Sequence, residues 1–535
     1  MPTLLHLHPD DPLAVATRDL VEGERVAVAE FNFTIAENIP AGHKVALVDL
    51  PEGAPVKKFG QYIGTTTTEI CRGDWIHSPN LTAGKLAGEH ELATAIPPDP
   101  TPLTGKTFLG YPRPGGRAGT RNYLAVISSV NCSATVAKRV AAHFTRERLA
   151  AYPNVDGVVA FTHGHGCGIE FRGEFHRLLN RVLGGMAKHP NIGGYLLIGL
   201  GCETVTPGAL IEDAKLVQVG DFRGSAKNDA AVGETNTAKT SPTPSSQPAS
   251  YAPPVLVMQN LGGTQNTIRA GIALVEQLLP RVNAFSRQPC PASQIILGTN
   301  CGGSDGNSGI TANAALGHAA DMLVAAGGTV ILAETTEIYG AEQLLTRRAR
   351  TPAVGQKLLD RIRWWEWYAG MYGCTPDNNP SPGNKAGGLT TIYEKSLGAI
   401  IKGGTTALNA VYEYAEQVTE RGLVVMDTPG LDPVSVTGIV AGGANLVAFT
   451  TGRGSCFGFK PSPVLKIASN TPMYLRMQAD MDINAGDILH GKPVNEVGQE
   501  IFQALLDLAS GKPSKSEAQD LGTEEFQPWM LGPTL

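Results

Sequence analysis

A glycine-rich turn near the middle of the chain gathers several side chains that could do chemistry. Residues 295–297 form a short aliphatic run, typical of a buried parallel strand, and Asn300, Cys301, Ser304 and Asp305 follow it closely. Apolar positions at helical spacing come next, so the turn joins a predicted strand to a predicted helix. Ligands bind at the carboxyl ends of such strands, where helix N–H groups and the helix dipole favour anions. These four side chains are therefore placed for substrate binding or catalysis.

Three upstream segments repeat the pattern of an apolar run that delivers a cysteine. Their cysteines are Cys132, Cys167, with His163 shortly before it, and Cys202. A single free cysteine is often only a small buried hydrophobic residue. Four cysteines in the same place relative to predicted strands instead favour one shared metal centre. Its predicted ligands are Cys132, His163, Cys167, Cys202 and Cys301.

Further charged residues stand at later turns. Glu334 ends a predicted strand, Lys402 precedes a Gly-Gly-Thr-Thr turn, and Thr451 and Arg453 share a glycine-rich turn. Such a turn exposes backbone amides, and Arg453 adds a bidentate partner for a carboxylate or phosphate. Lys385 lies in a long segment rich in Asn, Pro and Ser, which we interpret as a loop facing the substrate.

These residue types suit the removal of water from a hydroxylated acid. That reaction needs a base for the proton α to the carboxylate, an acid for the departing hydroxyl and a Lewis acid for the enediolate. Arg453 and Lys385 would bind the carboxylate, and Asn300, Ser304, Asp305 and Thr451 would bind the substrate's polar groups. Fe(II) or Mn(II) accepts mixed thiolate, imidazole and carboxylate ligands. No dinucleotide-binding or P-loop spacing is present, so nucleotide binding is a weak alternative.

The elements that position these groups predict an α/β protein in several parts. Residues 1–95 carry short, regularly interrupted strands and form a predicted β-clip or small barrel, and residues 96–116 form a proline-rich extended linker. Alternating strands and helices over 117–223 and 251–535 predict two α/β domains with mostly parallel sheets. The polar, low-complexity segment 224–250 is expected to be a disordered insertion.

Composition excludes several classes of protein. The net charge of -6 and the pI near 6.1 give no basic field for nucleic acid or anionic lipid. No segment approaches the roughly 20 apolar residues of a membrane span, and no signal pattern opens the chain. Eight cysteines in 535 residues are too few for a secreted disulfide framework. We therefore expect a cytoplasmic protein that binds a small molecule.

Many of these motifs together resemble the sugar-acid dehydratases that include altronate and galactarate dehydratase, over nearly the whole length. The matching segments include Gly-His-Lys at 42–44, Trp-Ile-His at 75–77, Gly-Leu-Gly-Cys-Glu at 199–203, Cys-Gly-Gly-Ser-Asp at 301–305, Asn-Pro-Ser-Pro-Gly-Asn-Lys at 379–385, Glu-Lys-Ser-Leu-Gly at 394–398, Thr-Thr-Gly-Arg-Gly at 450–454 and Met-Asp-Ile-Asn at 481–484. The resemblance implies an N-terminal SAF-type β-clip domain, an α/β body and iron- or manganese-dependent dehydration. The segments at 337–340 and 427–435 look closer to altronate dehydratase.

We therefore predict the metal-dependent conversion of D-altronate to 2-dehydro-3-deoxy-D-gluconate and water, by a homo-oligomer. Lys402, Glu334, His43 and His77 are the candidate acids and bases, the histidines only if the clip domain closes over the body. A second hypothesis changes the substrate to galactarate or another sugar acid. A third is a sugar-acid-binding protein without activity. An iron–sulfur cluster on the cysteines ranks below a single Fe(II) or Mn(II) ion.

Overall fold

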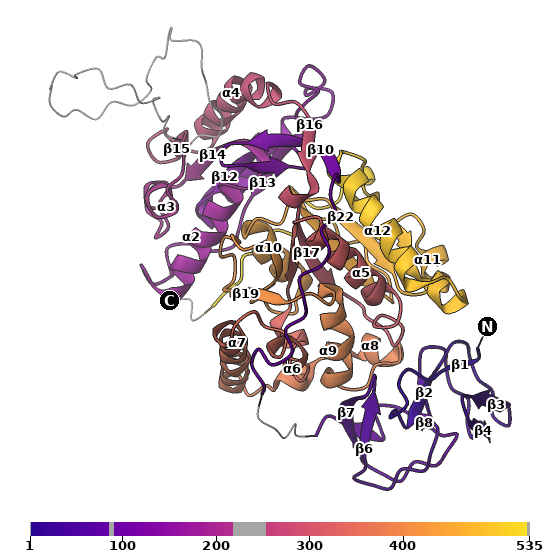
Figure 1. Cartoon of the computed structure of the whole chain (residues 1–535). Coiled ribbons are helices and arrows are strands. Elements are labelled where there is room, and N and C mark those ends of the chain that lie inside the picture. Colours follow the sequence, from indigo (N-terminus) through magenta and orange to yellow (C-terminus); the bar gives the residue numbers. More distant parts are fainter. Residues whose placement is uncertain (1, 85–89, 218–252, 532–535) are drawn as a thin grey trace.

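The computed structural model describes residues 2–84, 90–217 and 253–531, which form an N-terminal β domain and a two-part α/β body (Figure 1). The predicted insertion at 224–250 lies outside the described residues. The predicted α/β class is confirmed, since both large sheets of the body are parallel. No helix in the described ranges combines the length and apolarity needed to cross a bilayer.

The N-terminal domain, which we call the clip domain, folds into three small antiparallel sheets with strand orders β1-β2-β5-β8, β3-β4 and β6-β7-β9. Its strands are β1 (Leu4–Leu5), β2 (Leu13–Ala16), β3 (Arg25–Val28), β4 (Phe31–Thr34), β5 (Lys44–Ala46), β6 (Pro55–Lys58), β7 (Gln61–Thr66), β8 (Trp75–Ile76) and β9 (Leu81–Thr82). Glycines with positive φ, such as Gly42 and Gly53, close the turns between strands, where a side chain would be strained. The expected module of short strands is thus present.

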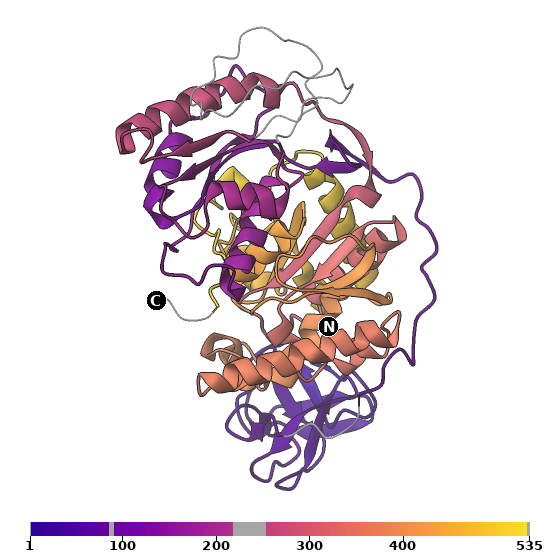
Figure 2. The ribbon, with the colours of Figure 1, turned by 90° about the vertical axis from the view of Figure 1, so that its left-hand side faces the viewer.

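A linker runs along the outside of the molecule from the clip domain to the body (Figure 2). Only its first half is without strands, because residues 107–113 form β10 (Thr107–Arg113). This strand pairs with β11 (Arg117–Gly119) and β16 (Gln288–Pro291) in an antiparallel sheet. The prediction of an extended linker through residue 116 therefore missed a strand, since its many prolines and glycines hid the pairing with β16.

The first α/β domain is built on a parallel sheet of order β13-β12-β14-β15. Its elements are β12 (Tyr123–Ser128), α1 (Asn131–Ala142), β13 (Gly157–Phe161), α2 (Glu174–Ala187), β14 (Ile192–Gly199), α3 (Pro207–Ala214), β15 (Val255–Val257) and α4 (Thr264–Asn283). β15 pairs with β14, so the prediction that the second α/β domain begins at residue 251 is wrong. The chain returns to the first sheet after the long insertion, which a sequence pattern could not reveal.

The second α/β domain contains a seven-stranded parallel sheet of order β19-β20-β18-β17-β21-β22-β23. The strands are β17 (Ile296–Cys301), β18 (Thr329–Leu332), β19 (Leu408–Tyr412), β20 (Gly422–Met426), β21 (Leu446–Thr451), β22 (Val464–Ala468) and β23 (Ile483–Asn484). The α-helices are α5 (Ala312–Ala325), α6 (Gln343–Thr346), α7 (Pro352–Met371), α8 (Pro382–Ala386), α9 (Ile392–Ile400), α10 (Asp432–Ala441), α11 (Thr471–Arg476), α12 (Val494–Ala509) and α13 (Lys515–Ala518). Short 3₁₀ turns include Thr335–Glu337 and Ile401–Gly403.

The two α/β domains share one hydrophobic core. Leu179 and Val182 of α2 pack in the same cluster as Ile439 of α10 and Phe449 of β21. α2 and α10 approach closely at Gly185, where an added Cβ would lie 2.3 Å from the carbonyl oxygen of Ala441. A residue with a side chain could not occupy that position without moving one helix, so the core holds the two domains together.

Candidate active site

A buried thiol, carboxylate and ammonium group meet at the carboxyl edge of the seven-stranded sheet. The Lys402 Nζ lies 2.8 Å from the Cys301 Sγ and 2.8 Å from the Glu334 Oε2, and the Cys301 backbone N–H donates to the same Oε2 at 2.9 Å. Lys402 and Glu334 are fully buried, and Cys301 is 2% exposed. Reactive groups so thoroughly removed from water are costly, which favours a functional role over a structural one.

Strand order explains why these residues meet. β17 and β18 are neighbours, so Cys301, the last residue of β17, lies beside Glu334, which follows β18. Glu334 adopts φ 65° and ψ 62°, a left-handed conformation that costs a residue with a Cβ about 1–3 kcal/mol. Its N–H donates to the Thr428 Oγ1 at 2.8 Å, which helps to hold this conformation. Lys402 enters from the turn after α9.

A second carboxylate and a second lysine extend the cluster. The Glu337 Oε2 accepts from the Cys301 Sγ at 3.3 Å, and the Lys395 Nζ donates to the Glu337 Oε1 at 2.7 Å. Asn379 bridges the pair, since its Oδ1 accepts from Lys395 at 2.9 Å and its Nδ2 donates to Glu337 at 3.2 Å. The long irregular segment predicted to face the substrate thus contributes Asn379 to this cluster.

Burial and mutual charge set the protonation of the cluster. Burial, with Glu334 next, raises the pKa of the Cys301 thiol well above its ordinary value. Burial would lower the pKa of Lys402, but the groups around it outweigh burial and raise that pKa, so the ammonium stays charged. Burial would likewise raise the pKa of Glu337, yet Lys395 and Lys402 hold it below its ordinary value. The positive charges of Lys402 and Lys395 thus lie beside the Cys301 thiol and the two carboxylates.

Asp432 is the group in this region with a pKa close to neutrality. It is the first residue of α10, and its Oδ1 accepts from the Asn300 Nδ2 at 2.9 Å. Burial, followed by the charges of Glu334 and Glu337, raises the pKa of Asp432 to about 7. A carboxyl group with such a pKa can both accept and donate a proton near physiological pH.

The same cluster offers ligands that fit a divalent metal ion. Ligand atoms of Cys301, Glu334 and Glu337 all lie within 4.8 Å of one another, and no other set of three such residues does so in the part of the chain that the structure describes. The Glu334 Oε1 and the Asn300 Oδ1 are buried without a hydrogen-bond partner. Buried unpaired oxygens beside a thiol form a mixed hard and soft donor set, which suits Fe(II) or Mn(II).

The predicted substrate-binding residues lie around the turn that follows β17. Asp305 braces this turn, because its Oδ1 accepts from the Ser308 Oγ and the Ser469 Oγ, both at 2.8 Å. The Thr451 Oγ1 accepts from the Gly454 N–H at 3.0 Å. Asp305 and Thr451 therefore already have structural partners.

The two predicted cations of this turn are free to bind an anion. Arg453 packs its Cβ against Gly303, and Lys385 adjoins Asn384, whose Nδ2 donates to the Ser304 carbonyl at 2.8 Å. Both cations are exposed, and neither has an ion pair among the described residues.

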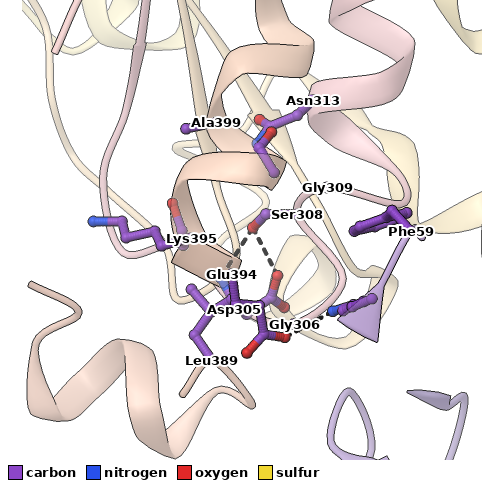
Figure 3. A pocket seen from close by; sticks show the side chains of 13 residues that line it. Phe59, Asp305, Gly306, Ser308, Gly309, Asn313, Leu389, Glu394, Lys395 and Ala399 are labelled. Carbon is purple, nitrogen blue, oxygen red and sulfur yellow. Dashed lines mark hydrogen bonds and ion pairs between the residues drawn. The ribbon is translucent and has the colours of Figure 1, made fainter. Parts of the chain in front are cut away.

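The clip domain docks onto α9, next to this turn, through a buried ion triad. Lys44 and Lys58 each place their Nζ 2.9 Å from the carboxylate of Glu394 on α9. Lys44 also donates to the Gly388 carbonyl at 2.7 Å. Beside the triad a cavity of about 10 Å³, room for one water molecule, is lined by Ser304, Asp305 and Glu394 (Figure 3). The clip domain therefore closes over the body, as the role proposed for its histidines requires.

Of the two histidines predicted as acids or bases, His43 has both ring nitrogens in hydrogen bonds. The Trp75 Nε1–H donates to the His43 Nδ1 at 3.0 Å, so the other ring nitrogen carries the proton and faces the Ala386 carbonyl at 3.3 Å. Burial, with Lys44 next, lowers the pKa of His43 to about 4. His77 stacks on Trp75 with ring centroids 4.2 Å apart. Both rings thus pack against Trp75.

The remaining thiols lie elsewhere, so the predicted single centre is wrong. Cys132, Cys167 and Cys202 are exposed at the carboxyl edge of the four-stranded sheet, whereas Cys301 is buried in the seven-stranded one. Their loops are joined by the Thr204 Oγ1, which donates to the Cys167 carbonyl at 3.0 Å. His163 is buried beside them, and burial lowers its pKa to about 4. The sequence pattern placed each thiol at a strand end but could not tell which sheet held it.

Sequence reasoning gave no role to four residues of the cluster: Glu337, Asn379, Lys395 and Asp432. Glu337 stands three residues after Glu334 in a 3₁₀ turn, a spacing that brings both side chains to one place. Lys395 lies within a motif quoted for the resemblance, as Asn379 does. Motif membership was the signal that could have found them.

Comparison with known proteins covers the whole chain. Family models match the altronate/galactarate dehydratase SAF domain at residues 2–84, the D-galactarate dehydratase/altronate hydrolase second domain at 110–283 and the D-galactarate/altronate dehydratase C-terminal domain at 292–534. Galactarate dehydratase (L-threo-forming) of Escherichia coli is 37% identical over 95% of this chain and 93% of its own. Altronate dehydratase is 33% identical in Escherichia coli, over 96% and 97% of the two chains, and 31% identical in Bacillus subtilis, over 100% of both. These matches confirm the resemblance drawn from the motifs: the chain belongs to the altronate and galactarate dehydratase family.

Proposed function

We propose that this protein is a metal-dependent hydro-lyase that removes water from a six-carbon sugar acid. The observation that carries the proposal is the buried cluster of Cys301, Glu334, Glu337 and Lys402, which joins a metal-binding donor set to fixed positive charge. The substrate class comes from the relatives, which are named as galactarate and altronate dehydratases. D-Altronate, which would give 2-dehydro-3-deoxy-D-gluconate, is the substrate that the sequence motifs favour.

Fe(II) or Mn(II) held by Cys301, Glu334 and Glu337 would supply the Lewis acid that stabilises an enediolate. The chain's own groups would move the proton. Asp432, with a pKa of about 7, is suited to take the proton α to the substrate carboxylate. Lys402 stays charged and therefore cannot be the base, so we assign to it the stabilisation of developing negative charge.

Substrate carboxylates would bind at the exposed cations of the turn. Arg453 and Lys385 flank residues 303–305 without ion pairs of their own in the described structure. One cation is enough for an aldonate such as altronate, whereas two would serve the two carboxylates of galactarate. Galactarate is therefore the second candidate substrate, which the 37% identity with a galactarate dehydratase also supports. The exposed thiols Cys132, Cys167 and Cys202 are a second candidate position for iron, including an iron–sulfur cluster.

Anaerobic assays with Fe(II) or Mn(II) on D-altronate, galactarate and other sugar acids, following 2-keto acid formation, test the proposal. Absence of product with every acid and metal would refute it and leave a sugar-acid-binding protein. Metal analysis of Cys301→Ser beside a Cys132→Ser/Cys167→Ser/Cys202→Ser variant locates the ion, with Cys374→Ser, an exposed cysteine of another segment, as control. Homo-oligomerisation, which size-exclusion chromatography tests, and a cytoplasmic location remain predictions of the sequence.

A further inference from the structure

A cavity of about 580 Å³ lies against helix α2 and shares no lining residue with the proposed catalytic cluster. Its wall contains the basic side chains Arg172, Arg177, Arg181 and Lys188, opposed by the single carboxylate of Asp213 on α3. Volumes of this size hold small-molecule ligands in other proteins. The excess of positive charge points to an anionic occupant.

Helix geometry explains how the cations gather. Arg177 and Arg181 are one turn apart on α2, and Lys188 follows at the end of the helix on the same side. Gly184 lies between them, and an added Cβ there would be 2.5 Å from the Cβ of Ala214 on α3. α2 and α3 thus meet at this glycine (Figure 1), and the same cavity wall contains the cations.

The cations have few anionic partners of their own. Arg181 makes a partly exposed ion pair with Glu413 at 3.2 Å, and Arg177 donates to the Arg172 carbonyl. Burial, with the positive charges of Arg117 and Lys215 next, lowers the pKa of Lys188. The local field is therefore positive even after the existing pair is counted.

Two buried polar atoms in the cavity wall lack partners and mark it as a built site. The His176 Nε2 and the Asn180 Oδ1 have no hydrogen-bond partner, although the residues are 2% and 5% exposed. Asn180 is already oriented, because its Nδ2 donates to the Asp213 Oδ2 at 2.7 Å. Its Oδ1 can only accept, so it calls for a hydroxyl or another donor from a ligand. A buried acceptor without a partner is unfavourable, and such a ligand would satisfy it.

We propose that this cavity binds a small hydroxylated anion, with Arg177 and Lys188 holding its carboxylate or phosphate and Asn180 accepting from one of its hydroxyl groups. The site is separate from the proposed active site. Its wall is made by residues of α2 and α3 and by Gln417, not by the carboxyl edge of the seven-stranded sheet. A sugar acid and a sugar phosphate share this chemistry. The proposal does not depend on which reaction the catalytic cluster performs.

Isothermal titration of the full-length, metal-depleted protein with galactarate, D-altronate, glucose 6-phosphate and inorganic phosphate tests the proposal. We expect at least one hydroxylated anion to bind, with affinity reduced at least tenfold in Arg177→Gln/Lys188→Gln and unchanged in Arg146→Gln, an exposed arginine beyond α1. Binding should persist in Lys385→Gln/Arg453→Gln, which removes the cations proposed for the catalytic substrate. The probe that binds with the highest affinity shows whether the cavity takes a carboxylate or a phosphate.

Asn180→Ala separates a built site from simple charge attraction. It should weaken the hydroxylated anion severalfold while leaving sulfate unchanged, because sulfate has no hydroxyl group to donate to the Asn180 Oδ1 near neutral pH. Thermal denaturation of each variant checks that it is folded. Absence of anion binding, or binding that Arg177→Gln/Lys188→Gln leaves intact, would overturn the proposal. Equal effects of Asn180→Ala on all anions would overturn the hydroxyl contact and with it the assigned ligand class.

Discussion

Replacing Glu394 by Gln should undock the clip domain from the body. Glu394 is 2% exposed and faces both Lys44 and Lys58, which are 0% and 2% exposed, so the change leaves two buried ammonium groups without a carboxylate. Removing one partner of a buried ion pair costs about 3–5 kcal/mol. Because the triad joins two domains, we expect most of this lost free energy to weaken the contact between the clip domain and the body.

Hydrogen–deuterium exchange measures that contact directly. Amides of α9 and of β7, which pack together across the interface, should exchange faster in Glu394→Gln. The matched control is Glu524→Gln, which breaks an exposed pair with Lys138 worth about 0–1 kcal/mol. Replacing all three triad residues by apolar ones of similar size should restore slow exchange, since no buried charge is then left unpaired. Unchanged exchange in Glu394→Gln would refute the reasoning.

The same triad gives a pH dependence. Burial would raise the pKa of Glu394, but Lys44 and Lys58 outweigh it and hold the pKa below its ordinary value. A carboxyl group whose pKa is lowered by folding stabilises the folded state above its unfolded pKa, and this stabilisation is lost as the pH falls toward the folded value. Docking should therefore weaken below about pH 4.5, which exchange measured at acidic pH checks, and Glu394→Gln should remove this dependence.

Three further predictions concern the catalytic cluster. Asp432→Asn should lower kcat by about 10²- to 10⁴-fold with little change in KM and should remove a pH–rate limb near pH 7; an unchanged pH profile would exclude Asp432 as the base. Cys301→Ser should reduce tightly bound iron or manganese, measured by elemental analysis, whereas Cys374→Ser should keep it; equal metal contents would place the ion elsewhere. Arg453→Gln should raise KM at least tenfold for every acid. If each cation binds one carboxylate, Lys385→Gln should raise KM mainly for galactarate, and an equal rise for altronate would contradict this assignment of one carboxylate to each cation.

The sequence was informative wherever a local pattern decides the structure. The apolar runs before Cys132, Cys167, Cys202 and Cys301 predicted parallel strands, and each of them forms one. Glycine-rich turns also located the edge of the sheet at which Cys301 and Arg453 lie. Periodicity and turn chemistry act over a few residues, so they can be read from the chain directly.

What the sequence could not supply was the pairing of distant segments. β15 joins the first sheet after more than fifty intervening residues, so the domain boundary was misplaced. For the same reason four thiols with similar surroundings were assigned to one centre, although they belong to two sheets. The roles of Lys395 and Asp432 depend on which carboxylates face them, which is a tertiary property. Lys402 was singled out from the sequence and lies in the buried cluster, but its charge state follows from its neighbours and favours the stabilisation of negative charge over the role of base.

Consecutive residues of helix α9 contact the clip domain and the buried cluster. Glu394 binds the clip lysines Lys44 and Lys58, whereas Lys395 binds Glu337 at 2.7 Å. Thr391, the N-cap residue of α9, donates its Oγ1–H to the Ile63 carbonyl of the clip domain at 2.5 Å, so docking also fixes the start of the helix. A shift of α9 on undocking would therefore move Lys395 relative to Glu337. We therefore expect the clip domain to act as part of the scaffold that positions Lys395 and the proposed catalytic cluster.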